Sequence, residues 1–430
     1  MEALNSIFAE IGRGLLNIWW LWTAILLGWL FASLWLAWRQ FLYKASRASA
    51  LLEIKIPRES KKTIRAMEHI LVNLSVLRNV QGNLREKWWD GEVTQWFSLE
   101  TVSFGGDIHF YIRTPTRHMK VVRSNFYAQY PDVELEEADD YMDRLPDSTQ
   151  ELYQEGYNLW GAELVLGNGD GLPIRTYMQF ESTVSEEENL DPLAGLWEVL
   201  SKINKEEILL VQILARPADP RTWPEKVKAE AVKFREETKA TMKGPLGEEY
   251  EIFTRTPGET EKMKQIEAKA FKPAFEFMIR YVYFAPQQIY NVNFAKRGVR
   301  SAFFQFSAPN MNYFESNRQT WTQAWIWDWP HIFPKRILEG RKQRMLYNYR
   351  HRSFPADTFF GKLTQFHIFT SSFTQKFSLL NVEELASIFH LPTEPVLTQP
   401  LMKRVESRKI GPPPGLPIFK EGEGPPGLMK

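Results

Sequence analysis

The 430-residue sequence contains no cysteine. Disulfides, thiolate metal ligands and cysteine nucleophiles are therefore excluded. An excess of one sign of charge is missing as well, because 53 basic residues are balanced by 52 acidic ones. The chain thus lacks the overall basic character of many nucleic-acid-binding domains, and a contact with a polyanion would require a local patch.

The motifs of common enzyme classes are also missing. The nearest approach to a phosphate-binding loop, residues 361–364, lacks the upstream glycine that such a loop needs to surround phosphates with backbone amides. The histidines form neither an H-E-x-x-H motif nor an i, i+4 pair, so the sequence predicts no zinc site. An acidic run alternates along an expected strand and is typical of a solvated sheet edge: Glu134, Glu136, Glu137, Asp139 and Asp140. We predict no catalytic site, no cofactor and no metal site.

One long apolar run is present. Residues 15–38 carry no charge. At about 1.5 Å per residue, a helix of this length spans the roughly 30 Å hydrocarbon core of a bilayer with some tilt. The run contains six tryptophans, and those near its ends suit the aromatic belts at membrane interfaces: Trp19, Trp20, Trp22, Trp29, Trp35 and Trp38. We predict a single-pass transmembrane helix over residues 15–38.

The charges that flank this run predict its orientation. Arg13 is the one basic residue before it, whereas several follow closely: Arg39, Lys44, Arg47, Lys55 and Arg58. Positive charge is retained on the cytoplasmic side, so residues 1–14 should lie outside an inner membrane and the body in the cytoplasm. A cleaved signal peptide is the alternative, with a cleavage site at residues 48–50. The apolar run is longer than a signal sequence requires, which disfavours cleavage.

Residues 50–145 show the element order β-α-β-β-α-β of a ferredoxin-like domain. The turn at Gly105-Gly106-Asp107 is a strong hairpin signal between its two central strands. The expected strands cover residues 51–56, 96–103, 108–113 and 132–138, and the expected helices cover 60–77 and 116–129.

Residues 172–310 repeat this order, with a helical hairpin inserted over residues 222–270. The expected strands cover 176–182, 208–214, 275–284 and 303–306, and the expected helices cover 191–203 and 286–297. The sequence therefore predicts an α+β protein, in which a transmembrane helix precedes two ferredoxin-like units and the second unit carries the hairpin.

Residues 311–379 are rich in tryptophan and basic side chains. Four tryptophans lie close together: Trp321, Trp325, Trp327 and Trp329. The basic run that follows is Lys335, Arg336, Arg341, Lys342, Arg344, Arg350 and Arg352. Three interpretations remain open: nucleic-acid binding, contact with an anionic membrane leaflet, and a solvated helix face with the tryptophans in a core or an oligomer interface.

Residues 380–430 carry a resemblance to a known family. Residues 380–392, LNVEELASIFHLP, are similar to the LNTEELAxxxHxP segment of conjugation-type proteins, as are residues 404–409 and the proline-rich residues 412–417. Further segments are similar to the same family: residues 97–113 together with 127–131, and residues 191–193 together with 212–214. The resemblance covers most of residues 50–417. In that family this stretch joins a membrane-anchored region to a hexameric DNA-translocating ATPase of type IV secretion systems.

The resemblance implies a non-catalytic scaffold. Because the chain ends at Lys430, where fused relatives continue into the ATPase, we expect the motor to be a separate polypeptide with which this protein assembles as an oligomer. Asn381 could cap a short helix that docks on the motor, through Asn381, Glu383, Glu384, Leu385, Ile388 and Phe389. The alternative for this helix is packing on the chain's own core. The alternative function is a membrane-tethered nucleic-acid-binding protein that uses the basic run.

Overall fold

The computed structural model describes residues 19–56, 63–180, 191–237, 239–243, 249–253, 256–308, 310–325, 331, 333–355 and 376–392. The expectations for residues 1–14, Trp327, Trp329 and the proline-rich tail lie outside the described residues.

A nine-stranded sheet is the centre of the described fold. Its strands are β1 (Ser49–Lys55), β2 (Phe97–Phe104), β3 (Asp107–Pro115), β4 (Glu134–Ala138), β5 (Tyr157–Leu166), β6 (Ile208–Pro217), β9 (Ala274–Pro286), β10 (Phe314–Ser316) and β11 (Ser378–Asn381). They follow the order β10-β5-β9-β6-β2-β3-β1-β4, and β11 pairs with the first part of β9. Every pairing in the sheet is antiparallel.

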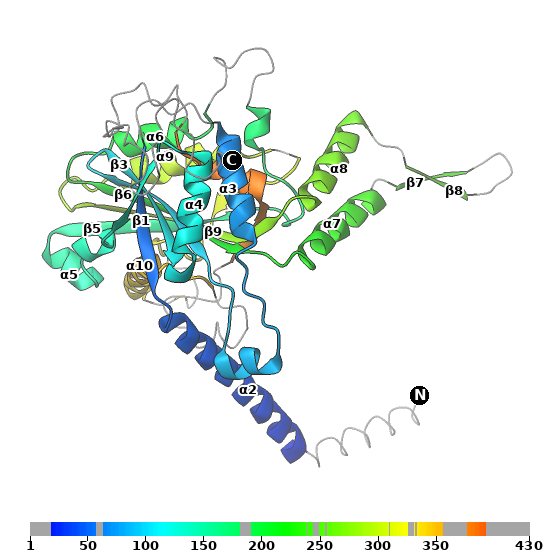
Figure 1. The fold of residues 1–430 in the computed structure, drawn as a ribbon, viewed down its shortest axis with the longest axis horizontal. Helices are drawn as coiled ribbons and strands as arrows, with labels where there is room; N and C mark the ends of the chain where they lie inside the picture. Colours follow the sequence, from blue (N-terminus) through cyan, green and yellow to red (C-terminus); the bar gives the residue numbers. More distant parts are fainter. Residues whose placement is uncertain are drawn as a thin grey trace, which may run out of the picture.

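The two halves of the chain meet at one seam in this sheet. Strand β2 of the first half pairs with β6 of the second half along its full length, from Phe97 opposite Ala215 to Phe104 opposite Ile208. Figure 1 shows the strands of both halves running side by side through this seam. The sheet is therefore continuous across the molecule.

Helices cover both faces of the sheet. The larger layer contains α3 (Ile64–Ser75), α4 (Met119–Gln129), α6 (Ala194–Ser201), α9 (Val292–Phe304) and α12 (Val382–Ile388). The opposite face is covered by α5 (Thr149–Gln154) and α10 (Pro334–Arg350). Side chains alternate between the two faces along each strand. In β1, Leu52 packs in the core beneath the larger helical layer, and Leu51 packs in the core beneath α5 and α10.

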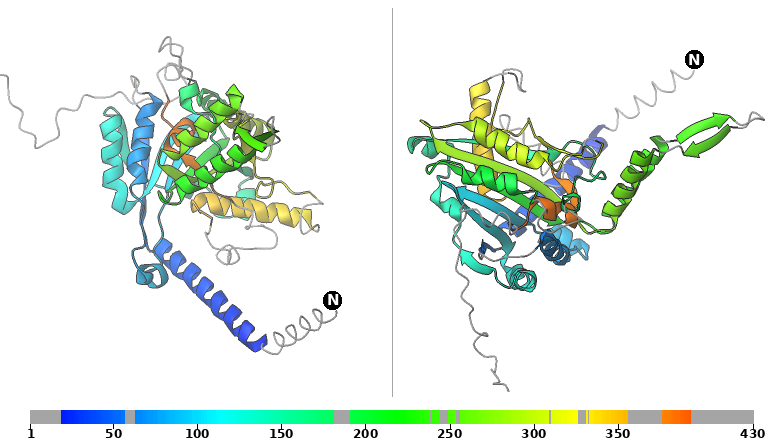
Figure 2. Two further views of the ribbon diagram at one scale, coloured as in Figure 1. Left: turned by 90° about the vertical axis from the view of Figure 1, so that its right-hand side faces the viewer. Right: turned by 90° about the horizontal axis from the view of Figure 1, so that it is seen from above.

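Two helices and a two-stranded ribbon lie within residues 223–270, where the helical hairpin was expected. Helices α7 (Trp223–Glu237) and α8 (Pro257–Ala270) pack together through Trp223, Val227 and Ile266. A two-stranded ribbon, β7 (Lys239–Lys243) and β8 (Glu249–Phe253), connects their far ends. The hairpin projects away from the sheet as an arm (Figures 1 and 2).

Helix α2 (Trp19–Ala45) leads into the first strand. Among the described residues it is the one helix that is long and apolar enough to cross a membrane, judged by length and composition. Its buried residues are Leu36 and Tyr43, near the end that joins the body. The helix continues beyond the predicted limit at Trp38 because Arg39 to Ala45 stay helical outside the apolar run.

The predicted α+β class is confirmed: an N-terminal apolar helix is followed in the chain by an antiparallel sheet with helices. The prediction of a strand over residues 176–182 is wrong. Tyr177–Gln179 forms a 3-10 turn, and residues 181 and 182 lie outside the described part. The first strand of the second half is β5, which starts at Tyr157 and so precedes the expected boundary at residue 172.

The last strand of the second half was also misplaced. Residues 303 and 304 belong to α9, and the strand that pairs with β5 is β10. The helix expected at residues 286–297 is shifted toward the C-terminus, because Pro286 still belongs to β9. Ala295, Val299 and Phe303 are buried at a spacing of four residues, which fixes α9 as a helix through Phe304.

The turn between β2 and β3 generates a prediction about stability. Gly105 has a φ of +58°, its amide donates to the Glu207 carbonyl (2.9 Å), and an added Cβ would lie 2.5 Å from the Lys205 carbonyl oxygen. We expect Gly105→Ala to lower the free energy of unfolding by about 1–2 kcal/mol for the left-handed backbone, plus about 1–3 kcal/mol for the collision. Chemical denaturation of the detergent-solubilised protein measures the change.

Gly156 is the matched control, since its φ is +79° and nothing lies within 4 Å of an added Cβ. Gly156→Ala should therefore cost only the backbone part, about 1–2 kcal/mol. Equal losses for the two variants would show that the contact with Lys205 does not constrain the turn.

Candidate functional site

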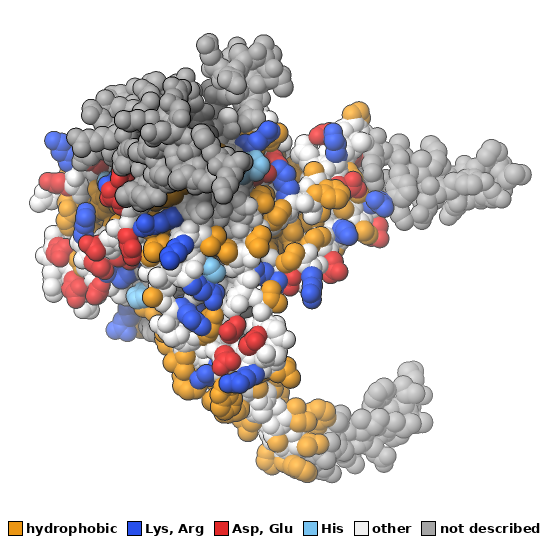
Figure 3. Space-filling view, viewed as in Figure 1, with side chains coloured by type: hydrophobic (Ala, Val, Ile, Leu, Met, Phe, Trp, Pro, Cys, Tyr) orange, Lys and Arg blue, Asp and Glu red, His pale blue; other side chains and the backbone are white. Residues whose placement is uncertain are grey.

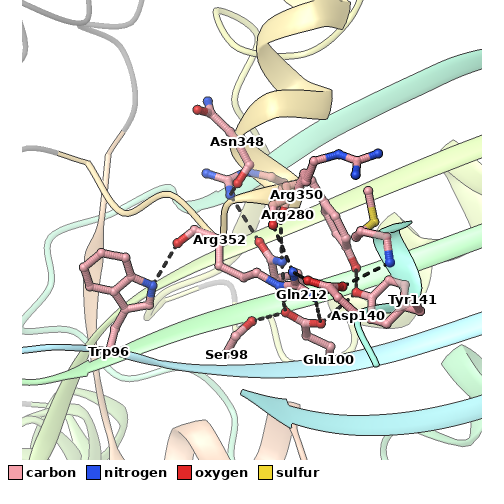
Figure 4. Close-up of polar contacts among 12 residues, drawn as sticks. Trp96, Ser98, Glu100, Asp140, Tyr141, Gln212, Arg280, Asn348, Arg350 and Arg352 are labelled. Carbon is pink, nitrogen blue, oxygen red and sulfur yellow. Dashed lines mark hydrogen bonds and ion pairs between the residues drawn. The ribbon is translucent and has the colours of Figure 1, made fainter. Parts of the chain in front are cut away.

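The most concentrated group of buried polar side chains lies between the sheet and α10 (Figure 4). At its centre is Glu100, in the middle of β2 and fully buried. Strand alternation places Glu100 on the same face as Ser98 and Val102, so its carboxylate points toward α10 instead of the larger core. A carboxylate in this position needs partners, because burying an unpaired charge is costly.

Arg352 is the main partner of Glu100. Its Nε lies 2.9 Å from Oε1 and its Nη2 lies 3.1 Å from Oε2, which is a bidentate arrangement. The same guanidinium binds Asp140, with 2.9 Å between Nη2 and Oδ1. The backbone of Arg352 is left-handed (φ +48°), and the Trp96 indole donates to its carbonyl oxygen at 2.8 Å. These contacts hold a backbone conformation that non-glycine residues rarely adopt.

A second buried ion pair extends the group across the seam. Arg280 of β9 contacts Glu163 of β5 through Nε and Nη2, both at 3.1 Å from Oε1. Gln212 of β6 connects the two pairs, because its side chain accepts from Arg280 Nη1 (3.2 Å) and donates to Glu100 Oε1 (3.1 Å). The charge network, defined as Glu100, Asp140, Glu163, Gln212, Arg280 and Arg352, thus joins strands from both halves.

Two tyrosines complete the hydrogen bonding. Tyr141 donates to Glu100 Oε2 at 2.7 Å, and its hydroxyl lies 2.9 Å from that of Tyr349. Burial raises the pKa of both tyrosines well above the ordinary value, so they stay protonated. Burial would also raise the pKa of Glu100, but the Arg352 guanidinium and the hydrogen bonds from Ser98 and Tyr141 hold it below its ordinary value.

The hydrogen bonds of the charge network are made within the protein and connect the segment after α10 to the sheet. Both oxygens of Glu100 accept from protein donors, which leaves the carboxylate saturated. Among the residues that the structure describes, no group of three or more His, Asp or Glu side chains could hold a metal ion. The physical role that follows is to hold the segment after α10 onto the sheet.

Most of the predicted basic run points inward. Arg341, Lys342 and Arg352 are buried, Arg344 and Arg350 are partly buried, and Lys335 and Arg336 are exposed. Lys342 Nζ contacts Asn158 Oδ1 at 2.6 Å, and Arg350 Nη1 contacts Asp147 Oδ1 at 2.8 Å. Burial lowers the pKa of Lys342. Five of the seven side chains are thus partly or fully taken up inside the protein, which argues against a continuous polyanion surface.

The predicted docking helix is capped as expected. Asn381 Oδ1 accepts from the Glu384 amide, and Glu384 Oε2 accepts from the Asn381 amide, each at 2.8 Å. Its apolar side chains Leu385, Ile388 and Phe389 are at most 2% exposed. The helix packs on α3 and continues from β11 of the sheet. This geometry favours the alternative of packing on the chain's own core.

Ion pairs fasten this C-terminal segment. Glu384 lies 3.1 Å from Lys269 Nζ, and both side chains are buried. Burial raises the pKa of Glu384 even though Lys269 and the amides of Asn381 and Ile174 oppose the change. Glu383 contacts Lys272 at 2.7 Å, at a partly exposed position.

His390 and Asp191 form a buried contact of 3.0 Å between Nε2 and Oδ1. The ring also bonds through Nδ1 to the Ala386 carbonyl oxygen at 2.9 Å. The residue pair belongs to two of the segments on which the family resemblance was based, residues 191–193 and 380–392. Segments that are 199 residues apart in the chain therefore meet in the core.

Glu100, Glu163, Gln212 and Arg280 were not predicted as site residues, although Gln212 lies in one of the segments that carry the family resemblance. The available signal was a charged or amide side chain inside an otherwise apolar strand, as in FSLETVSF around Glu100. By contrast, the acidic run at β4 is largely exposed, as expected for a sheet edge. Asp140 is the exception, since it pairs with Arg352.

Residues 38–404 match the model of a family described as "Domain of unknown function (DUF8128)". No curated protein matches the chain. The matched range includes the sheet, both helical layers and the C-terminal segment through α12.

The charge network predicts a specific pattern of stability. Arg352→Met should lower the free energy of unfolding by about 3–5 kcal/mol, because it leaves Glu100 buried without its cation. The double variant Glu100→Met with Arg352→Met should lose less than the sum of the two single variants. Chemical denaturation of the solubilised protein measures each loss.

Arg336→Met is the matched control, since Arg336 is exposed at the start of α10. Its effect should stay within about 0.5 kcal/mol. Additive losses from Glu100 and Arg352 would contradict a direct coupling between them.

The lowered pKa of Glu100 predicts how this contribution depends on pH. A depressed pKa in the folded state stabilises the fold above the ordinary value of 4.5, and this stabilisation is lost as pH falls through the folded-state pKa. The difference in unfolding free energy between the wild type and Glu100→Gln should therefore be constant above 4.5 and should shrink below it. A difference that grows on acidification would contradict the assigned sign.

Proposed function

The chain belongs to the family described as "Domain of unknown function (DUF8128)", and from this premise we propose that it is a membrane-anchored scaffold without catalysis of its own. The partner that it recruits is a separate DNA-translocating ATPase of the conjugation or type IV secretion kind. The membrane anchor is a single pass through the inner membrane, with the body in the cytoplasm.

The observation that carries this proposal is the exposed apolar surface of α2. Trp19, Leu27 and Phe31 are each more than 60% exposed, and apolar side chains extend along the helix (Figure 3). Soluble monomers rarely expose contiguous apolar patches beyond a few hundred Å². A bilayer covers such a surface, and the tryptophans suit its interfaces.

The basic side chains at the end of α2 support the orientation. Arg39 lies 5.9 Å from the ring of Trp38, and Arg47 lies 4.7 Å from the ring of Tyr43. Lys44 lies 5.4 Å from the ring of Trp96, which belongs to the body. Positive charge is thus gathered where the helix joins the body, the side that is retained in the cytoplasm.

The sheet supports an origin from two ferredoxin-like units. In the first half, the spatial order β4-β1-β3-β2 places the last strand next to the first and the third next to the second. The second half has the same arrangement, β10-β5-β9-β6, with the arm inserted between β6 and β9. The helices α3 and α4, like α6 and α9, occupy the crossover positions of the β-α-β-β-α-β order. The units share one sheet through β2 and β6.

Because α12 packs in the core of the chain, we propose that the ATPase contact lies in the tail, residues 393–430. Since Leu385, Ile388 and Phe389 lie in the core, they are not offered to a partner. The chain leaves the described body at residue 392, two residues after His390 is held by Asp191. Proline-rich sequences are common recognition motifs, and residues 412–417 beyond this point form such a sequence.

The experiment compares two chains in a pull-down from detergent-solubilised membranes. The full chain should recover a motor ATPase, and a chain truncated after Pro392 should lose it while remaining folded. The truncation point preserves β11 and α12, whose residues pack in the core. Mass spectrometry identifies the bound proteins.

A full-length chain with residues 393–430 in scrambled order is the matched control for tail length and composition. Recovery of the ATPase by the truncated chain would move the contact to the body. Failure of every chain to recover an ATPase would contradict the scaffold proposal.

A further inference from the structure

A loop between α3 and β2 leaves the body and reaches the transmembrane helix. Residues 76–96 carry a single π-helical turn, η1 (Glu86–Asp90), which packs beside α2 (Figure 1). We name residues 76–96 the foot loop. Its length exceeds what a connection between neighbouring elements needs, which draws attention to the surface that it presents.

The foot loop is fixed to one level of α2. The Trp35 indole donates to the Trp88 carbonyl oxygen at 2.8 Å, and the rings of Trp35 and Trp89 lie 5.8 Å apart. Gly91 has a φ of +69°, and an added Cβ would lie 2.4 Å from the Arg39 carbonyl carbon. Any larger residue at this position would push the loop from the helix. The contact therefore spans residues 35–39 of α2.

The foot loop is ordered by its own hydrogen bonds. Glu86 accepts from the Gly82 amide (2.6 Å) and from the Asn83 side chain (2.9 Å). Asn79 donates to Glu92 at 2.9 Å. Backbone groups near η1 are also engaged within the loop, because the amides of Lys87 and Glu92 donate to the carbonyl oxygens of Asn83 (3.2 Å) and Glu86 (2.9 Å).

This ordered loop exposes apolar side chains. Leu84 is 76% exposed, and Trp89 is 62% exposed although its ring contacts Trp35 of α2. A shallow hollow lies between Leu84, Arg85, Trp88 and Trp89. Large apolar side chains that are ordered but exposed to solvent indicate a surface that contacts a membrane or another protein.

The position of the foot loop along α2 indicates what covers its exposed apolar surface. The uncharged stretch of α2 ends at Trp38 and the first charge is Arg39, so the boundary of the hydrocarbon core falls where the foot loop is seated. Trp88 and Trp89 suit the interfacial belt. The exposed Arg85 and Lys87 can reach headgroups. The foot-loop surface is continuous with the surface that the anchor already presents to lipid.

We propose that the foot loop is a second membrane contact, in which Leu84 and Trp89 enter the boundary between headgroups and acyl chains beside α2. This inference rests on the proposed membrane anchor. The helix alone would fix only an axis, whereas a second contact at its side also fixes the rotation of the body about that axis. The occupant is the lipid bilayer.

The absence of cysteine allows a direct test. A single cysteine replaces Leu27 in α2, Leu84 in the foot loop or Phe304 in α9, and each is labelled with the fluorophore NBD. Phe304 is 64% exposed and α9 lies at the end of the body opposite α2 in Figure 1. The full chain is reconstituted in phosphatidylcholine–phosphatidylglycerol vesicles that carry nitroxide lipids, with the nitroxide either near the headgroup or deep in the acyl chain.

The expected result is loss of fluorescence at Leu84→Cys with the shallow nitroxide and at Leu27→Cys with the deep one. Phe304→Cys should keep its fluorescence with both. If Leu27→Cys is quenched but Leu84→Cys behaves like Phe304→Cys, the second contact is overturned while the anchor stands. If Leu27→Cys is not quenched by either lipid, the anchor itself is overturned and the inference with it.

Discussion

The pairing of Glu100 with Arg352 is the interaction on which the rest of the body depends. The carboxylate lies in β2 at the seam where the two halves of the sheet meet, and the guanidinium arrives from the end of α10. Since Gln212 and Arg280 extend the contact into β6 and β9, the charge network crosses the seam. A charge buried here is satisfied only when both halves and α10 are in place. The network therefore couples the stability of the sheet to that of its second layer.

Buried ion pairs also hold the C-terminal segment, β11 and α12, on the side of the sheet that carries the larger helical layer. Lys269, at the end of the arm helix α8, bonds the carbonyl oxygens of Leu172 and Leu379 and pairs with Glu384 of α12. The base of the arm is thereby fixed to the strand and helix that end the described chain. His390 adds a connection to Asp191, which precedes α6. Arm, tail and second half are consequently held by the same few buried groups.

The sequence predicted the elements whose signals are local. Strands β1 to β4 alternate or follow a glycine turn, and they lie within a few residues of their expected limits. Asn381 was predicted as the cap of a short helix, and in the structure it forms a capping box with Glu384, three residues further on. The α7–α8 hairpin was recognised because charged helical patterns flank a glycine-rich break.

Elements set by tertiary contacts could not be found in this way. Strand β5 contains Gly161 and Glu163, which interrupt an apolar pattern until Arg280 supplies a partner. Strand β10 has three residues and exists because β5 offers an edge. Arg352 is 252 residues from Glu100, so no window of sequence relates them. For the same reason the basic run looked like a surface, when it is largely the inner side of α10.

The joint between α2 and β1 has a mechanical consequence. Three residues separate Ala45 from Ser49, and each is tied by a backbone bond: Ser46 to Leu42, Arg47 to Lys44 and Ala48 to Thr116. A transmembrane helix adapts to bilayers of different thickness by tilting. In the membrane-anchored state that we propose, a tilt of α2 would therefore be transmitted through this short joint to the whole sheet, and the arm, which lies far from the joint, would move the most.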